Sequence, residues 1–236
     1  MLFFPQNLII FKFAKTILIM LFTDFIKFIP TIEKEKLLST DAHIKMAPLE
    51  RISYLKEENY KDKNPKKAAV LMLIYPKNEI AHLALIVRNS YPGVHSSQIG
   101  FPGGKVEETD FNLEETALRE THEEVGIHPD KIKIIKPFSE IYIPPSNFLV
   151  APFMGISNEE LTFIPDLDEV KRVLEFSIAD FLDEKSITKV KMSTSYATDI
   201  EVPAFMVDKY VVWGATAMMM SELKETIKCA LSKCNL

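Results

Sequence analysis

Three carboxylates and one arginine are spaced so that they can act together on one side of a helix. Glu120, Glu123 and Glu124 fall within an arc of about 100° at 3.6 residues per turn, and we call them the acidic ridge. Like charges at this spacing repel each other unless a partner neutralises them. Mg²⁺ or Mn²⁺ would be such a partner, because both ions prefer hard oxygen ligands. Arg119 lies one residue before Glu120 and four before Glu123, where it can orient a carboxylate.

A glycine-rich loop directly precedes this acidic segment. The chain has only seven glycines, and five of them fall in one stretch: Gly93, Gly100, Gly103, Gly104 and Gly126. Paired glycines such as Gly103 and Gly104 let the backbone approach a ligand closely, and turned N–H groups can hold phosphate oxygens. A phosphate-binding backbone beside a carboxylate-bound metal ion predicts phosphoryl chemistry.

The helix that must position the acidic ridge is expected between about residues 113 and 125. Asn112 can cap its start, with Glu115 returning the bond, and Gly126 is the expected residue after its C-terminal end. A second face of the helix is predicted to pack on a sheet, and it consists of Ala117, Leu118, Thr121 and Val125.

The remaining pattern predicts an α/β fold, a mixed sheet covered by helices. Two apolar runs, residues 68–76 and 83–88, are typical of buried strands and are joined by a turn at Lys77–Glu79. Further elements are strands within 131–143 and 149–156, a strand and short helix in 170–181, and a strand leading into an amphipathic helix in 210–233. Trp213 and Met218–Met220 are expected to be core packing.

Three parts of the chain are distinguished by composition. Residues 1–22 form an apolar N-terminal extension, residues 23–65 an N-terminal helix and linker, and residues 66–236 the main domain. In the linker, some fixed structure is expected around 43–49. Phe25, Ile26 and Ile29 share a face of the expected N-terminal helix.

The extension, residues 1–22, allows three interpretations. Lys12 and Lys15 interrupt it, and its longest clean run, Ile17–Phe22, is too short to span a membrane. An anchor or interfacial helix, a signal peptide, and translated upstream sequence with the working start at Met20 therefore stay open.

Composition limits the classes of protein. The 236 residues are 47% hydrophobic and 26% charged, which allows a real core and excludes a disordered chain. The net charge of −5 argues against a nucleic-acid partner. Only two cysteines occur, Cys229 and Cys234, which excludes a disulfide scaffold and a cysteine-based zinc site. This cysteine usage fits a reducing compartment, so we expect the cytoplasm.

The stretch GGKVEETDFNLEETALRETHEEVGI resembles the signature of the Nudix hydrolases. Asp110 stands where that pattern has its first Glu, eight rather than seven residues before Arg119, and Thr121 replaces an apolar residue. The coenzyme A diphosphatase branch of the family shares these departures. The matching positions are Gly104, Arg119, Glu120, Glu123, Glu124, Gly126 and Ile127.

The resemblance to this branch extends over roughly residues 66–225. Ile143–Ile156 and Tyr210–Ala217 are similar to it, but Gly93 stands where the branch has Arg and Ser97 where it has Gly. Within residues 85–104 the matching positions are Arg88, His95, Gln98, Phe101, Pro102, Gly103 and Gly104. The resemblance makes five of them candidates for substrate binding: Arg88, His95, Gln98, Gly103 and Gly104.

The resemblance implies a Nudix-type α/β/α sandwich that hydrolyses a diphosphate linkage in a small nucleotide derivative. The expected substrate is coenzyme A or an acyl thioester, cut to 3′,5′-ADP and a 4′-phosphopantetheine derivative. The acidic ridge and the backbone of Gly104 would hold Mg²⁺ or Mn²⁺, and Arg119 would orient Glu120. Glu169, in a later loop, is the candidate for an additional base.

Other functions stay open at this point. One is a Nudix hydrolase of ADP-ribose or another dinucleotide, and a second is a non-catalytic nucleotide sensor. The sensor is disfavoured because the acidic ridge is complete and no DNA-binding module is visible. A membrane location is expected only if residues 1–22 are translated, and a homodimer is left open.

Overall fold

A computed structural model describes residues 19–89, 98–192 and 200–234. Eight of the described strands form one sheet in the order β3-β2-β1-β7-β5, with β4 beside β1, β6 beside β7 and β8 beside β2. The sheet is mixed because β1 and β7 run parallel while the other pairs are antiparallel. Its strands are β1 (Lys66–Lys77), β2 (Ile80–Arg88), β3 (Ile99–Gly100), β4 (Gly103–Lys105), β5 (Lys133–Pro137), β6 (Ile141–Ile143), β7 (Phe148–Ile156) and β8 (Val170–Ser177).

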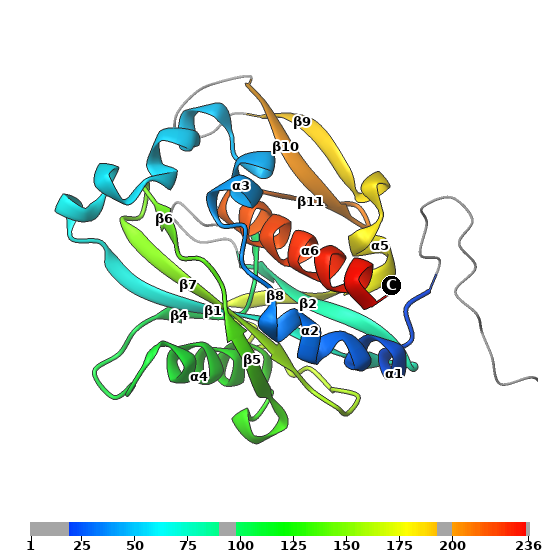
Figure 1. The fold of residues 1–236 in the computed structure, drawn as a ribbon. Coiled ribbons are helices and arrows are strands. Elements are labelled where there is room, and N and C mark those ends of the chain that lie inside the picture. Colours follow the sequence, from blue (N-terminus) through cyan, green and yellow to red (C-terminus); the bar gives the residue numbers. More distant parts are fainter. Residues whose placement is uncertain (1–18, 90–97, 193–199, 235–236) are drawn as a thin grey trace, which may run out of the picture.

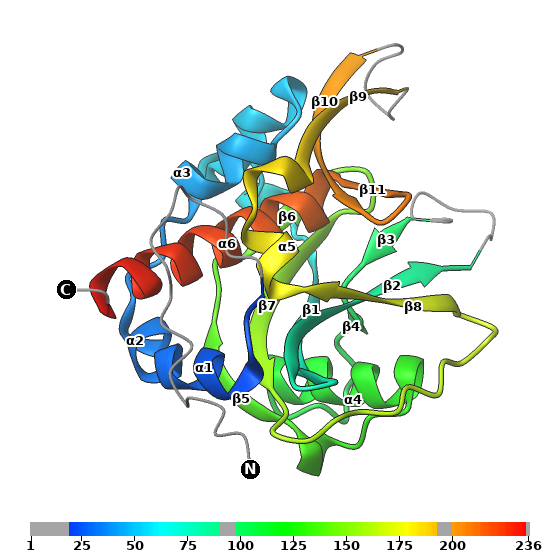
Figure 2. The same cartoon turned by 90° about the vertical axis from the view of Figure 1, so that its right-hand side faces the viewer.

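Helices cover both faces of this sheet, which confirms the predicted α/β/α sandwich. Figures 1 and 2 show α4 (Leu113–Val125) on one face and α6 (Gly214–Cys234) on the other. Side chains of β1 alternate between two cores, because successive residues of a strand point to opposite faces. Met72 and Ile74 join the core under α6, whereas Leu71 and Leu73 join the core over α4.

A smaller three-stranded sheet, which the sequence analysis did not predict, adjoins the start of α6 (Figure 1). It consists of β9 (Ile187–Met192), β10 (Ile200–Val207) and β11 (Tyr210–Trp213), with β10 in the middle. The short α5 (Ile178–Leu182) leads into it from β8, as the pattern predicted. Pro203 lies inside β10, and a proline normally argues against a central strand, which explains the omission.

The N-terminal segment is part of the same core. Its helices are α1 (Phe22–Phe25), α2 (Ile29–Lys34) and α3 (Thr40–His43). Met20, Phe22, Phe25 and Ile32 are buried in the cluster that contains the apolar face of α6. The backbone of Met20 also accepts a 3.0 Å hydrogen bond from Ala81 N. No helix in the described ranges combines the length and apolar character that crossing a bilayer requires.

The prediction that Phe25, Ile26 and Ile29 share one apolar face of the N-terminal helix is partly wrong. Phe25 is fully buried and Ile29 packs on the core, but Ile26 is 37% exposed. A 3₁₀ turn at Ile26–Phe28 separates α1 from α2, and its three residues per turn rotate Ile26 off the face that an α-helix would give it.

Residues 40–65, expected to be a linker, carry short helical turns. The turns span Ile44–Met46, Leu49–Leu55, Glu57–Asn59 and Lys61–Lys63. His43, in the region expected to be ordered, is 3% exposed, and its Nε2 lies 3.4 Å from the buried carboxylate of Glu222 in α6. Glu222 also accepts hydrogen bonds from Ser39 N (2.6 Å) and from Ser139. These contacts tie the segment to α6 and to the loop after β5.

The burial of Phe25 leads to a stability prediction. Phe25→Ala should lower the free energy of unfolding by about 3–5 kcal/mol, because it removes a fully buried ring and leaves a cavity. The neighbouring Ile26→Ala should change it by about 0.5 kcal/mol or less, since that side chain is exposed. Urea unfolding followed by circular dichroism measures both variants. Equal losses would show that residues 20–34 do not contribute to the core as described.

Candidate active site

The acidic segment folds as the helix α4, whose bounds, Leu113–Val125, are those predicted. Asn112 Oδ1 accepts a 2.9 Å hydrogen bond from Glu115 N, and Gly126 ends the helix with φ of 73°. The return bond differs in one detail, because Glu115 accepts from Phe111 N rather than from Asn112 N. Both ends of the helix are therefore fixed by local contacts that the sequence encodes.

The packing face of α4 is confirmed, but the acidic ridge is not a uniform surface. Ala117, Thr121 and Val125 are fully buried against the sheet. Along the ridge, the side chain of Glu123 is 55% exposed, that of Glu120 is 15% exposed and that of Glu124 is only 2% exposed. A solvated charged face would leave all three exposed, so the ridge faces into the protein at one end.

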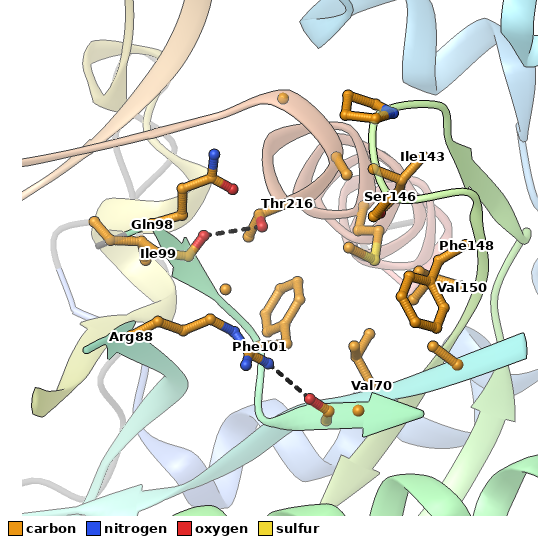
Figure 3. Close-up of a pocket in the computed structure, with 18 of the residues that line it drawn as sticks. Val70, Arg88, Gln98, Ile99, Phe101, Ile143, Ser146, Phe148, Val150 and Thr216 are labelled. Carbon is orange, nitrogen blue, oxygen red and sulfur yellow. Dashed lines mark hydrogen bonds between the residues drawn. The ribbon is translucent and has the colours of Figure 1, made fainter. Parts of the chain in front are cut away.

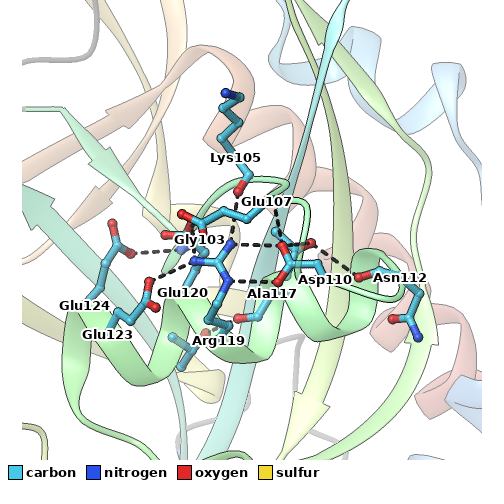
Figure 4. A network of polar contacts seen from close by, with 12 residues as sticks. Gly103, Lys105, Glu107, Asp110, Asn112, Ala117, Arg119, Glu120, Glu123 and Glu124 are labelled. Carbon is cyan, nitrogen blue, oxygen red and sulfur yellow. Dashed lines mark hydrogen bonds and ion pairs between the residues drawn. The ribbon is translucent and has the colours of Figure 1, made fainter.

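Arg119 binds three carboxylates at once (Figure 4). Its Nε and Nη2 contact the two oxygens of Asp110 at 2.9 and 3.0 Å, and its Nη1 lies 3.0 Å from Glu120 and 2.8 Å from Glu123. Hydrogen bonds from Arg119 hold the pKa of Asp110 well below its usual range, and Asp110 in turn raises the pKa of Arg119. The contacts to Glu120 and Glu123 were expected, whereas the two-point contact with Asp110 was not.

Glu124 is held by the glycine loop and by Arg88. Its Oε2 accepts a 2.8 Å hydrogen bond from Gly103 N, and its Oε1 lies 3.2 Å from Arg88 Nη2. The same Arg88 nitrogen donates a 2.7 Å hydrogen bond to Gly103 O. Burial raises the pKa of Glu124 to about 7, although the charge of Arg88 and the N–H of Gly103 act in the opposite direction. A shift in strand pairing at Val87–Arg88, typical of a β-bulge, marks the end of β2 from which Arg88 projects.

The two glycines of the loop fit their positions for different reasons. Gly103 has φ of 148°, and a Cβ there would collide with the backbone of Ala69 and Val70. At Gly104 a Cβ would collide with the carboxylate of Glu120. Only glycine therefore leaves room for Glu120 against β4, where burial raises the pKa of that carboxyl group.

A cavity of about 550 Å³ lies beside this loop, on the α6 side of the sheet (Figure 3). Three segments that the resemblance had singled out converge on it: the loop with Gln98 to Gly104, the segment from Ile143 to Val150, and the start of α6. Arg88, Gln98, Gly103 and Gly104 all line the cavity. His95, the fifth predicted substrate-binding residue, lies outside the described residues. Trp213, predicted to be core packing, is half-buried and lines the cavity, whereas Met218 and Met220 are fully buried as predicted.

Comparison with known proteins decides the family. Residues 65–194 match the NUDIX domain. The chain belongs to the Nudix family. It is 31% identical over 186 residues to the uncharacterized Nudix hydrolase NudL of Enterobacter sp. (strain 638), covering 74% of this chain and 90% of the relative. It is 33% identical over 164 residues to NudL of Klebsiella pneumoniae subsp. pneumoniae, covering 68% and 82% of the two chains.

Solved structures give weaker matches. A binary complex of Caenorhabditis elegans Ap4A hydrolase aligns with a TM-score of 0.46 and 17% identity, over 71% of this chain and 98% of that one. Family membership makes the protein a Nudix hydrolase, an enzyme that acts on nucleotide diphosphate derivatives. Nudix hydrolases generally use divalent metal ions.

The carboxylates of the acidic ridge on α4 are the kind of ligand that a divalent cation prefers, although they are not gathered around one point. Within the described residues, no three histidine, cysteine, aspartate or glutamate side chains are arranged to hold a metal ion. Arg119 pairs with Glu120 and Glu123, whereas Arg88 and Gly103 N hold Glu124. The donors are nevertheless hard oxygens, and the buried Oε1 of Glu124 accepts no hydrogen bond within the described residues. A cation would offset the burial that raises the pKa values of Glu120 and Glu124.

Glu169, the candidate additional base, lies in the loop before β8. Asp166 N in this loop bonds to Glu124 O at 3.0 Å, and Asn89 N bonds to Glu169 O at 2.8 Å. The Glu169 side chain is exposed, and its negative charge contributes to the raised pKa of both Glu120 and Glu124. The Nudix domain therefore brings Glu169 within electrostatic reach of the ridge.

Sequence reasoning assigned no individual role to Arg51 or to Thr216, which both line the cavity. Thr216 Oγ1 donates a 3.0 Å hydrogen bond to Ile99 O and so joins α6 to β3. Arg51 belongs to the turn Leu49–Leu55, in the segment expected to be a linker. Arginine is almost never fully buried unless it has a partner, so the burial of Arg51 is a sign of a specific contact. The sequence does not reveal that burial, and the signal can be recognised only once the fold is known.

Proposed function

We propose that this Nudix hydrolase cuts the diphosphate linkage of coenzyme A or an acyl-coenzyme A, giving 3′,5′-ADP and a 4′-phosphopantetheine derivative. The observation that carries the proposal is the cavity beside the Gly103–Gly104 loop, which combines apolar walls with cationic side chains. Val70, Phe101, Phe148 and Trp213 supply apolar surface, and Arg88 joins the cavity to Glu124. Such a site suits a ligand that has both an anionic diphosphate and a large organic part.

We propose the following roles for the residues of the site. The acidic ridge and the backbone of Gly104 would hold Mg²⁺ or Mn²⁺, which stabilises charge on the phosphate oxygens and lowers the pKa of water when it is bound. Arg119 positions Glu120 and Glu123 through the contacts described above. Arg88 fixes Gly103 O and offers its charge to the diphosphate. Gln98 and the Gly103–Gly104 backbone complete the wall of the cavity. His95 stays a candidate for substrate binding on the basis of the sequence. Glu169 is the candidate for the additional base.

Product analysis tests this function. Purified protein is incubated with coenzyme A, ADP-ribose and NADH, each with Mg²⁺, with Mn²⁺ and with EDTA. We expect coenzyme A to be converted to 3′,5′-ADP and 4′-phosphopantetheine with either ion and to survive in EDTA. Turnover of ADP-ribose with a kcat/KM a hundredfold higher than that of coenzyme A would contradict the proposal, and the departures at Gly93 and Ser97 would then matter.

A further inference from the structure

We propose that Arg51 binds a second phosphate of the substrate, separate from the diphosphate that is cut, and so selects nucleotides that carry it. The inference rests on the proposed function, in which that group is the 3′-phosphate of coenzyme A. Arg51 precedes residues 65–194, which match the NUDIX domain, so the family match assigns it no role.

Arg51 is held firmly at the cavity wall. Its Nη2 donates a 2.7 Å hydrogen bond to Tyr142 O in β6, and the residue is only 5% exposed. The rest of its segment packs on the same tyrosine. The ring of Tyr60 stacks on that of Tyr142 at 4.8 Å, and the ring of Tyr54 lies 6.2 Å from it. These contacts fix the place of Arg51 relative to the sheet.

Arg51 and Arg88 belong to opposite walls. Figure 3 places Arg88 and Gln98 on one side of the cavity and Ile143 and Phe148 on the other. Arg51 bonds to the residue directly before Ile143, so it lies with the second wall. A ligand that met both arginines would need two anionic groups with an organic part between them.

The charges of the cavity point to the same kind of ligand. Its charged lining residues are Arg51, Arg88 and Lys105, and no aspartate or glutamate lines it among the described residues. This excess of positive charge occurs in a protein with a net charge of −5. A guanidinium group carries five N–H donors in a planar fork that matches phosphate, so Arg51 can hold Tyr142 O and a phosphate oxygen together.

Kinetics with a matched pair of substrates test the proposal. The wild-type enzyme should prefer coenzyme A to dephospho-coenzyme A by about tenfold or more in kcat/KM, mainly through KM. Arg51→Gln should bring this ratio close to one, and Arg51→Lys should keep part of it. Lys61→Gln is the control, because it removes a cation from an exposed position in the same segment, outside the cavity lining, and should leave the ratio at the wild-type value. A wild-type ratio in Arg51→Gln overturns the proposal.

Binding gives a second test that does not depend on turnover. Trp213 is the only tryptophan of the chain and it lines the cavity, so its fluorescence should report a ligand there. In EDTA, 3′,5′-ADP should bind the wild-type protein at least about tenfold more tightly than 5′-AMP, and Arg51→Gln should abolish the difference. Equal affinities in the wild-type protein, or binding of neither nucleotide, overturn the proposal. Selective binding of 3′,5′-ADP without cleavage of coenzyme A would refute the proposed function alone.

Discussion

Replacing Glu124 by Gln is expected to lower kcat by at least a few hundredfold while the domain stays folded. Glutamine keeps the size of the side chain and an oxygen that can accept the hydrogen bond from Gly103 N. It removes the negative charge that pairs with Arg88 and that would help hold the metal ion. Losing a ligand that stabilises charge on phosphate should cost about 3 kcal/mol or more of transition-state stabilisation. The exposed Glu123→Gln should show a similar loss of kcat.

A third substitution separates this effect from a general change in charge. Glu114 is exposed on the same helix, so Glu114→Gln makes the same change of charge away from the ridge and should keep wild-type kcat. Initial rates of coenzyme A hydrolysis at saturating Mg²⁺, with circular dichroism as the check of folding, give the comparison. Near-wild-type kcat in both Glu123→Gln and Glu124→Gln would contradict the assignment of the acidic ridge as the catalytic site.

Gly103→Ala is expected to destabilise the protein by about 3 kcal/mol or more. The backbone at φ of 148° is rarely adopted by residues with a side chain, and a strained position of this kind costs about 1–3 kcal/mol. The new methyl group would also meet the backbone of Ala69 and Val70, and overpacking adds a similar cost. Strand β4 would have to move away from β1, so activity should fall together with stability.

Gly104→Ala is the matched comparison for this prediction. Its Cβ would meet only the carboxylate of Glu120 among its nearest neighbours, and that group is the end of a flexible side chain. We therefore expect kcat to fall while the urea midpoint stays near that of the wild-type protein. If Gly103→Ala unfolds at the same urea concentration as Gly104→Ala, the backbone described for β4 is wrong.

Helix α4 was the most predictable part of the protein, because the residues that determine its bounds and packing face lie within or next to the helix. Asn112, Gly126 and the apolar face set its bounds and its orientation without help from the rest of the chain. The same periodicity could not distinguish Glu124 from Glu123. Their difference in burial depends on Gly103 and Arg88, which come from other strands.

The rest of the site depends on contacts between distant parts of the chain. Residues 49–63 look polar and charged in the sequence, and their role as a cavity wall depends on the contacts of Arg51 and Tyr60 with Tyr142. The sequence analysis did not predict β10, the central strand of the small sheet, because Pro203 lies within it. Trp213 was expected in the core, but it lies where that sheet and α6 meet the cavity.

The pairing of the N-terminal segment with α6 has a consequence for synthesis on the ribosome. Ser39 and Glu222, which are hydrogen-bonded, are 183 positions apart, and the buried faces of Phe22, Phe25 and Ile32 share their core with α6. Until α6 has left the exit tunnel, these side chains and one face of the large sheet lack their partner. A nascent chain in that state exposes apolar surface for much of translation, which favours aggregation and chaperone binding. Ribosome-bound chains in which α6 is still inside the tunnel should therefore be more protease-sensitive than chains from which the whole helix has emerged.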